Sequence, residues 1–158
     1  GSGTILREVI EAAAILKADF DVDADVWSAT SFNELRRDGL ITSRWNMLHP
    51  EETPRQSFVE ECLEGAKGPV VASTDYMKSY ADQIREFISG TYTVLGTDGF
   101  GRSDTRERLR HFFEVDRYFI VVAALTALVE DNVVDVGQVA AAIKKFGIDP
   151  EKVNPALS

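Results

Sequence analysis

The chain has 158 residues, of which 44% are hydrophobic and 27% are charged. A chain of this length buries about 70% of the surface that it exposes when unfolded, so we expect one domain spanning residues 1–158. Seventeen Lys and Arg stand against 26 Asp and Glu, and the net charge is -9. This charge excludes generic attraction to nucleic acid or to an anionic membrane.

Cysteine content and hydropathy indicate the cellular compartment and whether the chain has a membrane segment. The single cysteine, Cys62, excludes an internal disulfide, and no Cys and His residues are spaced as in a zinc site. The longest apolar run, Tyr118–Leu125, is too short to cross a bilayer. We therefore expect a cytoplasmic protein without a membrane segment.

The amino-terminal quarter predicts a helix followed by a strand. Apolar residues recur at helical spacing over residues 4–17. Four Asp residues then alternate with apolar residues, which predicts a half-buried strand over Asp19–Trp27. This acidic stretch is no EF-hand calcium loop, because Ala24 and Thr30 stand where such a loop needs Gly and Glu.

Two short helices are predicted before the centre of the chain. Ser31 and the Glu three residues after it form a capping box, which opens a helix over Phe32–Asp38. Gly39 supplies the stop, and the next fifteen residues are expected to be irregular. The second helix should follow Pro54 and include Phe58–Leu63.

The central region has the pattern of a parallel crossover. Val70–Ser73 is a short apolar run bounded by turn signals, as in a buried strand, and Tyr92–Leu95 predicts a second strand. Between them, Thr74 or Asp75 can cap a helix that extends to Ile88. Two strands joined through a helix predict a right-handed parallel connection.

The carboxyl-terminal third is predicted to be helical. A helix should open at Ser103 or Asp104, and two more should cover Asp116–Glu130 and Val136–Phe146. The whole pattern predicts the α/β class: a three-layer, doubly wound domain with a small, mostly parallel sheet and helices on both faces.

One loop has the composition of a functional site. Residues 96–104 follow a predicted strand, contain three glycines and open a helix. Backbone N–H groups there, with Arg102 and Arg106, could hold an anion or meet another domain. The alternative is a tight turn in which the glycines adopt positive φ and Asp104 caps the helix. The spacing fits neither a dinucleotide fingerprint nor a P-loop. The candidate residues are Asp98, Gly99, Gly101, Arg102, Ser103 and Arg106.

No complete active site follows from the residues alone. Asp98 with Gly99, and Asn132 further on, match the Mg²⁺ loop of a thiamine diphosphate enzyme incompletely, so no metal or cofactor site is predicted. His49 and His111 have no neighbouring nucleophile in a recognisable motif, and His111 stands one turn after Glu107 as on many surface helices.

The chain closely resembles the carboxyl-terminal region of the homodimeric pyruvate dehydrogenase first component, a family of transketolase-like thiamine diphosphate enzymes. The resemblance extends over essentially the whole chain. The segments that carry it are Ser31–Leu35, Arg44–Pro50, Val70–Lys78, Gly96–Asp104, Glu107–Asp116 and Lys152–Pro155.

The resemblance implies an enzyme several times longer, whose upstream domains bind thiamine diphosphate and Mg²⁺. In such enzymes the cofactor attacks pyruvate, CO₂ leaves, and the acetyl unit passes to a lipoyl group on the acyltransferase core. No residue of this chain matches the family's cofactor-activating Glu, metal loop or pyruvate-handling histidines. The family also places a strand immediately before a turn like Gly1–Gly3.

The resemblance therefore implies a non-catalytic structural and dimerisation domain without a cofactor of its own. Its expected partners are the upstream domains of the same enzyme, the second subunit of a homodimer and the lipoyl acyltransferase core. The alternative function is a freestanding α/β module that binds an anionic ligand at the loop Gly96–Asp104.

Overall fold

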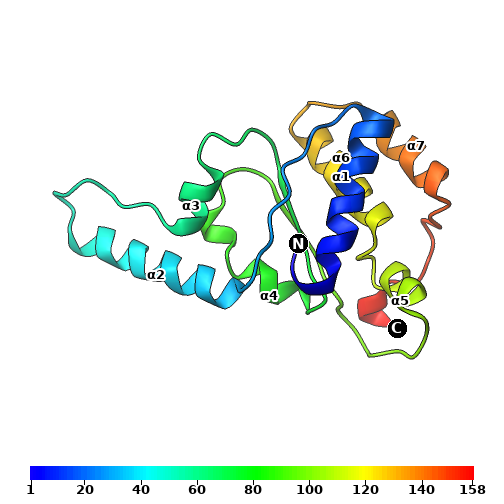
Figure 1. The fold of residues 1–158 in the computed structure, drawn as a ribbon, viewed down its shortest axis with the longest axis horizontal. Coiled ribbons are helices and arrows are strands. Elements are labelled where there is room, and N and C mark those ends of the chain that lie inside the picture. Colours follow the sequence, from blue (N-terminus) through cyan, green and yellow to red (C-terminus); the bar gives the residue numbers. More distant parts are fainter.

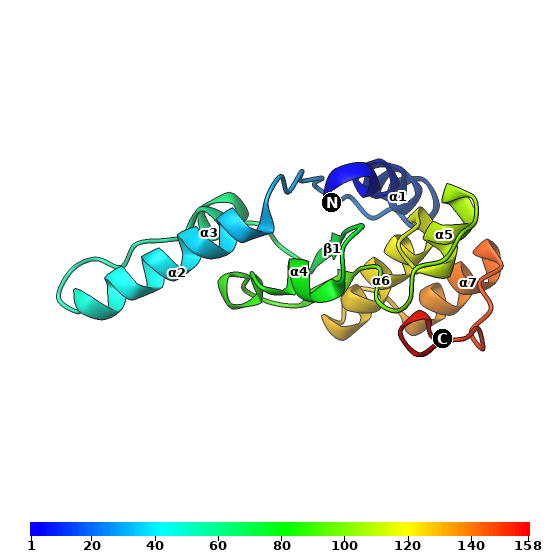
Figure 2. The ribbon, with the colours of Figure 1, turned by 90° about the horizontal axis from the view of Figure 1, so that it is seen from below.

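The computed structural model describes residues 1–158 as a body from which an arm projects (Figures 1 and 2). Helices α2 and α3 make the arm, and α1, α5, α6 and α7 gather at the opposite end. None of the helices is both long and apolar enough to cross a membrane. The elements are, in chain order, α1 (Leu6–Phe20), α2 (Phe32–Leu48), α3 (Phe58–Leu63), β1 (Val70–Ser73), α4 (Lys78–Asp82), β2 (Tyr92–Leu95), α5 (Arg106–Phe112), α6 (Arg117–Glu130) and α7 (Val136–Phe146), with 3-10 turns at Gly3–Ile5, Arg85–Phe87 and Pro155–Leu157.

The sheet consists of two parallel strands. β1 pairs with β2 in a register that sets Val70 opposite Tyr92 and Ser73 opposite Leu95. The connection between the strands contains α4. The predicted strands, the parallel crossover and the mixed α/β class are thus confirmed.

The first hydrophobic cluster holds α1, α6 and α7 together. Ile5, at the start of α1, and Val121 and Leu125 of α6 are fully buried. α6 contacts α1, α7 and both strands, which explains why apolar residues surround most of this helix. The predicted bounds of the helices at 116–130 and 136–146 are confirmed, with Asp116 as N-cap and Gly147 as C-cap.

The second cluster joins the arm to the sheet. Phe32 of α2 and Val59 of α3 pack with Tyr92 of β2 and Phe87. The prediction that α2 stops at Gly39 was wrong, since α2 continues to Leu48 and Gly39 lies buried inside it. A Cβ atom at Gly39 would lie 2.4 Å from the Phe87 ring, so this glycine provides close packing within a helix.

The strand predicted over residues 19–27 is absent. α1 continues to Phe20 and ends at Asp21, which adopts a left-handed conformation with φ 53°. Lys17 holds the acidic stretch, with Nζ 3.0 Å from Asp21 Oδ1 and 2.9 Å from Asp23 Oδ2. The alternation therefore belongs to an exposed segment and not to a sheet.

Residues 22–29 have no strand beside them to pair with. Their contact with β1 passes through Gly1 and Ser2: Ala29 N donates to Gly1 O at 2.9 Å, and Ser2 N donates to Ser73 O at 3.2 Å. Gly1 N donates to Trp27 O at 2.8 Å. The first two residues thus lie between this segment and the carboxyl end of β1.

Two helix starts also differ from the prediction. Thr74 and Asp75 do not cap a long helix, because α4 begins only at Lys78 and is followed by the separate turn Arg85–Phe87. α5 is capped by Thr105 and not by Ser103 or Asp104, since the Thr105 hydroxyl accepts from Arg108 N.

Candidate functional site

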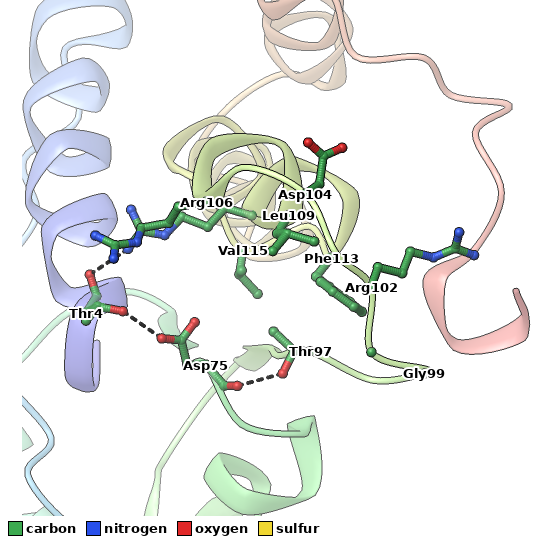
Figure 3. Close-up of a pocket in the computed structure, with 12 residues that line it drawn as sticks. Thr4, Asp75, Thr97, Gly99, Arg102, Asp104, Arg106, Leu109, Phe113 and Val115 are labelled. Atoms are coloured by element: carbon green, nitrogen blue, oxygen red, sulfur yellow. Dashed lines mark hydrogen bonds between the residues drawn. The ribbon is translucent and has the colours of Figure 1, made fainter.

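The carboxyl ends of the two strands and the amino-terminal turn meet at one place (Figure 3). Thr4 Oγ1 donates to Asp75 Oδ2 at 2.6 Å, and Thr97 Oγ1 donates to the backbone oxygen of Asp75 at 2.6 Å. Beneath them, Ser2 Oγ donates to the buried Thr74 Oγ1 at 2.8 Å. Asp75 follows β1 and Thr97 follows β2, which is the edge where open α/β sheets place their ligands.

These residues form one wall of a cleft of about 570 Å³. α5 and the loop before it form the other wall (Figure 3). Five of the twelve lining residues are arginines or aspartates, so the cleft carries both signs of charge. The lining residues are Thr4, Asp75, Thr97, Gly99, Gly101, Arg102, Asp104, Arg106, Leu109, Arg110, Phe113 and Val115.

Arg110, one of the three arginines of the cleft, is neutralised by a carboxylate. Its Nη1 lies 2.7 Å from Glu8 Oε1, and Glu8 also accepts from Arg117 Nε at 2.9 Å. Burial alone raises the pKa of Glu8, but the hydrogen bonds from Arg117 and the charges of both arginines outweigh burial and hold the pKa below its usual value. Arg110 therefore serves to hold α5 against α1 through Glu8.

The two arginines predicted as site residues point to opposite ends of the cleft (Figure 3). Arg102 extends toward the carboxyl terminus, where its guanidinium lies 4.4 Å from the centre of the Phe112 ring and donates to Ser158 Oγ at 3.2 Å. Arg106 extends toward Thr4 and is exposed. A single small anion would therefore not meet both charges.

The remaining predicted residues shape the loop. Asp98 Oδ1 accepts from Lys78 N at 2.9 Å and so caps α4. Gly99 has φ 105°, and a Cβ atom there would lie 2.1 Å from Pro155 O. Gly101 is different, because its φ is not positive and a Cβ atom would meet nothing within 4 Å. The expectation of positive φ is confirmed for Gly99 and wrong for Gly96 and Gly101. Ser103 is exposed.

The sequence analysis does not identify Thr4 and Asp75 as lining residues, and it includes Thr97 in the candidate loop without naming it as a site residue. Asp75 and Thr97 could have been found, because each stands just after a predicted parallel strand and such ends share one edge. Thr4 gives no such signal, since the first turn reaches the sheet only through tertiary contacts.

The residues present do not fit a magnesium or thiamine diphosphate site. No three His, Cys, Asp or Glu side chains are close enough to hold a metal ion together. Asp98 caps α4, and Asn132 closes α6 in a left-handed conformation. His111 pairs with Asp116, whose Oδ2 lies 2.9 Å from the imidazole Nδ1, and not with Glu107 as its spacing suggested.

Residues 1–116 match the model of the transketolase-like TK C-terminal domain family. The chain belongs to this family, and the resemblance found in the sequence is confirmed. The chain is 65% identical over 156 residues to the pyruvate dehydrogenase E1 component of Pseudomonas aeruginosa. It is 57% identical over 159 residues to the pyruvate dehydrogenase E1 component of Escherichia coli. These alignments cover 98% and 100% of this chain but 18% of each relative, so the chain spans less than a fifth of their length.

Proposed function

We propose that the chain is the non-catalytic, carboxyl-terminal structural and dimerisation domain of a pyruvate dehydrogenase first component. The observation that supports this proposal most directly is the 65% identity over 98% of the chain with a pyruvate dehydrogenase E1 component. The full-length enzyme would oxidatively decarboxylate pyruvate with thiamine diphosphate and Mg²⁺, and pass the acetyl unit to a lipoyl group of the acyltransferase core.

A structural role is supported by the hydrogen bonds and ion pairs that the charged lining residues make inside the domain. Asp75 accepts from Thr4, Asp104 accepts from Thr105 N at 2.7 Å, and Arg110 pairs with Glu8. Each of these charged groups thus has a partner inside the domain that helps to hold the cleft walls together. The exposed Arg106 is the cleft charge most available to a neighbouring domain.

The proposal is tested by comparing this chain with an enzyme of the relatives' length. The 158-residue chain should bind no thiamine diphosphate with Mg²⁺ in a calorimetric titration and should release no CO₂ from pyruvate. The long enzyme should do both. Stoichiometric, micromolar cofactor binding by the short chain would overturn the non-catalytic assignment, and a long enzyme inactive on pyruvate would overturn the assigned activity.

The cleft is proposed to meet another domain through Arg102 and Arg106. Replacing both with Gln should change the melting temperature of the short chain little, because both side chains are exposed and the contacts of Arg102 with Phe112 and Ser158 lie at the surface. In the long enzyme the same change should weaken assembly or activity. The matched control replaces the exposed Arg7 and Lys144 with Gln, which removes the same charge elsewhere. Equal stability losses in both proteins would contradict a contact role.

A free anion-binding module is the second candidate, and the cleft with three arginines is the observation that favours it. Asp75 and Asp104 line the same cleft and repel an anion, and Arg110 is neutralised by Glu8. Titration of the short chain with inorganic phosphate separates the candidates. Saturable binding that is lost in Arg106→Gln would favour the module, and no binding up to about 10 mM would favour the domain contact.

A further inference from the structure

The last residues of the chain contact the loop that forms part of the cleft wall before α5. We call residues 98–104 of this loop the lid, and residues 152–158 the strap. Figure 3 shows the turn of the strap beside the lid. A Cβ atom at Gly99 would lie 2.1 Å from Pro155 O, so the two backbones touch there. Pro155 is buried, and it lies in a 3-10 turn that Asn154 caps. The strap thus meets the lid with an ordered turn.

Lys152 anchors the strap at the carboxyl end of α5. Its Nζ donates at 2.8 Å both to Phe112 O and to Glu114 Oε1. The helix dipole favours an ammonium group at this position, and only 18% of the Lys152 side chain is exposed. α5 is itself held by Arg110, which pairs with Glu8. The strap therefore extends from a fixed point to the lid.

The lid has few attachments other than the strap. Its fixed ends are Asp98, which caps α4, and the position before Thr105, which caps α5. Residues 98–104 form no backbone–backbone hydrogen bond, and Phe100 is 81% exposed. Segments with few hydrogen bonds and little buried surface open at a low free energy. The contacts with the strap therefore decide which position the lid adopts.

Arg102, on the lid, has partners of different strength on its two sides. In the structure its guanidinium lies on the Phe112 ring and donates to Ser158 Oγ of the strap, which is a neutral acceptor. Across the cleft, the carboxylate of Asp75 is exposed and is bound by the neutral hydroxyl of Thr4. A guanidinium binds a carboxylate more strongly than a hydroxyl. Asp75 therefore attracts Arg102 into the cleft, and the strap keeps it outside.

We propose that the strap holds the lid open, and that release of the strap lets the lid close over the cleft with Arg102 paired to Asp75. The open and closed states differ in identified contacts, as a conformational switch requires. The inference deepens the proposed function, because the contact of Arg102 with another domain then depends on the strap. It rests on that function for nothing else.

Spin labels on the two sides of the cleft test the movement. In the 158-residue chain with Cys62→Ser, labelled cysteines replace Gly101, which has open space around it, and Arg7, which is exposed on α1. Double electron–electron resonance measures the distance between the labels. Thr4, the partner of Asp75, lies about one turn before Arg7, so closure shortens this distance. The measurement needs no pyruvate, cofactor or second domain, so its failure is distinguished from failure of the assigned activity.

Two changes release the strap at different points. Lys152→Met removes the ammonium group and keeps the apolar stem, and Asn154→Ala removes the side chain that accepts from Ala156 N at 2.9 Å. Each should raise the fraction of molecules with the shorter distance, Lys152→Met by at least about fivefold. Lys145→Met is the matched control, because Lys145 of α7 also pairs with a carboxylate, 2.8 Å from Asp19 Oδ1. It should leave the fraction unchanged. Circular dichroism verifies that each variant is folded, and an unchanged distance in both released variants would overturn the proposal.

Further changes test the contact that closes the lid. Added to Lys152→Met, Asp75→Asn or Arg102→Gln should each remove the shorter distance, because either change removes the ion pair of the closed state. Arg106→Gln should leave the shorter distance in place, since Arg106 is not part of that pair. A shorter distance that survives Asp75→Asn, or one that depends on Arg106 and not on Arg102, would overturn the proposal.

Discussion

The guanidinium Nε of Arg117 lies 2.9 Å from Oε2 of Glu8 and joins the first turn of α6 to α1. Arg110 of α5 reaches the other oxygen of the same carboxylate, with its Nη1 2.7 Å from Oε1. Three helices therefore meet on one buried acid, which is 5% exposed. This cluster lies directly behind the cleft and fixes the wall that carries its arginines.

We expect Glu8→Gln to destabilise the chain by about 2–4 kcal/mol, because it leaves two arginines beside a neutral side chain in a largely buried place. Urea denaturation followed by circular dichroism measures the loss. Glu11→Gln is the control, since Glu11 also pairs with Arg117, at 3.3 Å, but is more than half exposed. It should cost less than about 1 kcal/mol. Similar losses for the two variants would show that burial of the pair matters little.

The same carboxylate predicts how stability depends on pH. The pKa of Glu8 is lowered in the folded state, so the unfolded chain binds more protons at acidic pH. The stability from Glu8 is present above the ordinary glutamate pKa of about 4.3, and is lost as the pH falls through the lower folded value. The difference between the unfolding free energies of the native chain and Glu8→Gln should therefore shrink between pH 6 and pH 3. A constant difference would contradict this assignment.

Local sequence patterns predict the strands and helices whose formation depends on their own residues. The two strands and α6 and α7 follow from apolar runs, caps and stop residues near them in sequence, such as Asp116 and Gly147. The stretch Asp19–Trp27 has the alternation of a strand but has no neighbouring strand to pair with. The sequence of one segment does not show whether such a neighbour exists.

The helix and site errors have the same origin. Glycine commonly ends helices, which predicts a stop at Gly39. The structure instead uses Gly39 inside α2, because the Phe87 ring, far along the chain, leaves no room for a side chain there. Glu8 and Arg117 are 109 residues apart, so their pairing leaves no mark in local spacing. The loop at residues 96–104 was found because its glycines and its position after a strand are local features.

Gly99 and Gly101 offer a matched pair for the loop. Gly99→Ala should cost about 1–3 kcal/mol, since Gly99 has φ 105° and its new methyl group would clash with Pro155 O. Gly101→Ala should be nearly neutral, because that position has open space around it. Thermal unfolding of the two variants measures the difference. Equal melting temperatures would mean that the turn Pro155–Leu157 does not hold Gly99 in place.

Gly39 provides the corresponding test of the arm. In an exposed helix interior, Gly to Ala stabilises by about 1 kcal/mol, but a Cβ atom at Gly39 would lie 2.4 Å from the Phe87 ring. The ring is buried and cannot move freely, so steric overlap should outweigh helix propensity and Gly39→Ala should destabilise by about 1–3 kcal/mol.

A double-mutant cycle with Phe87→Leu separates the two effects, because the smaller side chain removes the clash while the gain in helix propensity remains. The double variant should be more stable than the sum of the single losses predicts, with a coupling of about 1 kcal/mol or more. Additive losses would show that α2 does not pack on Phe87 in solution.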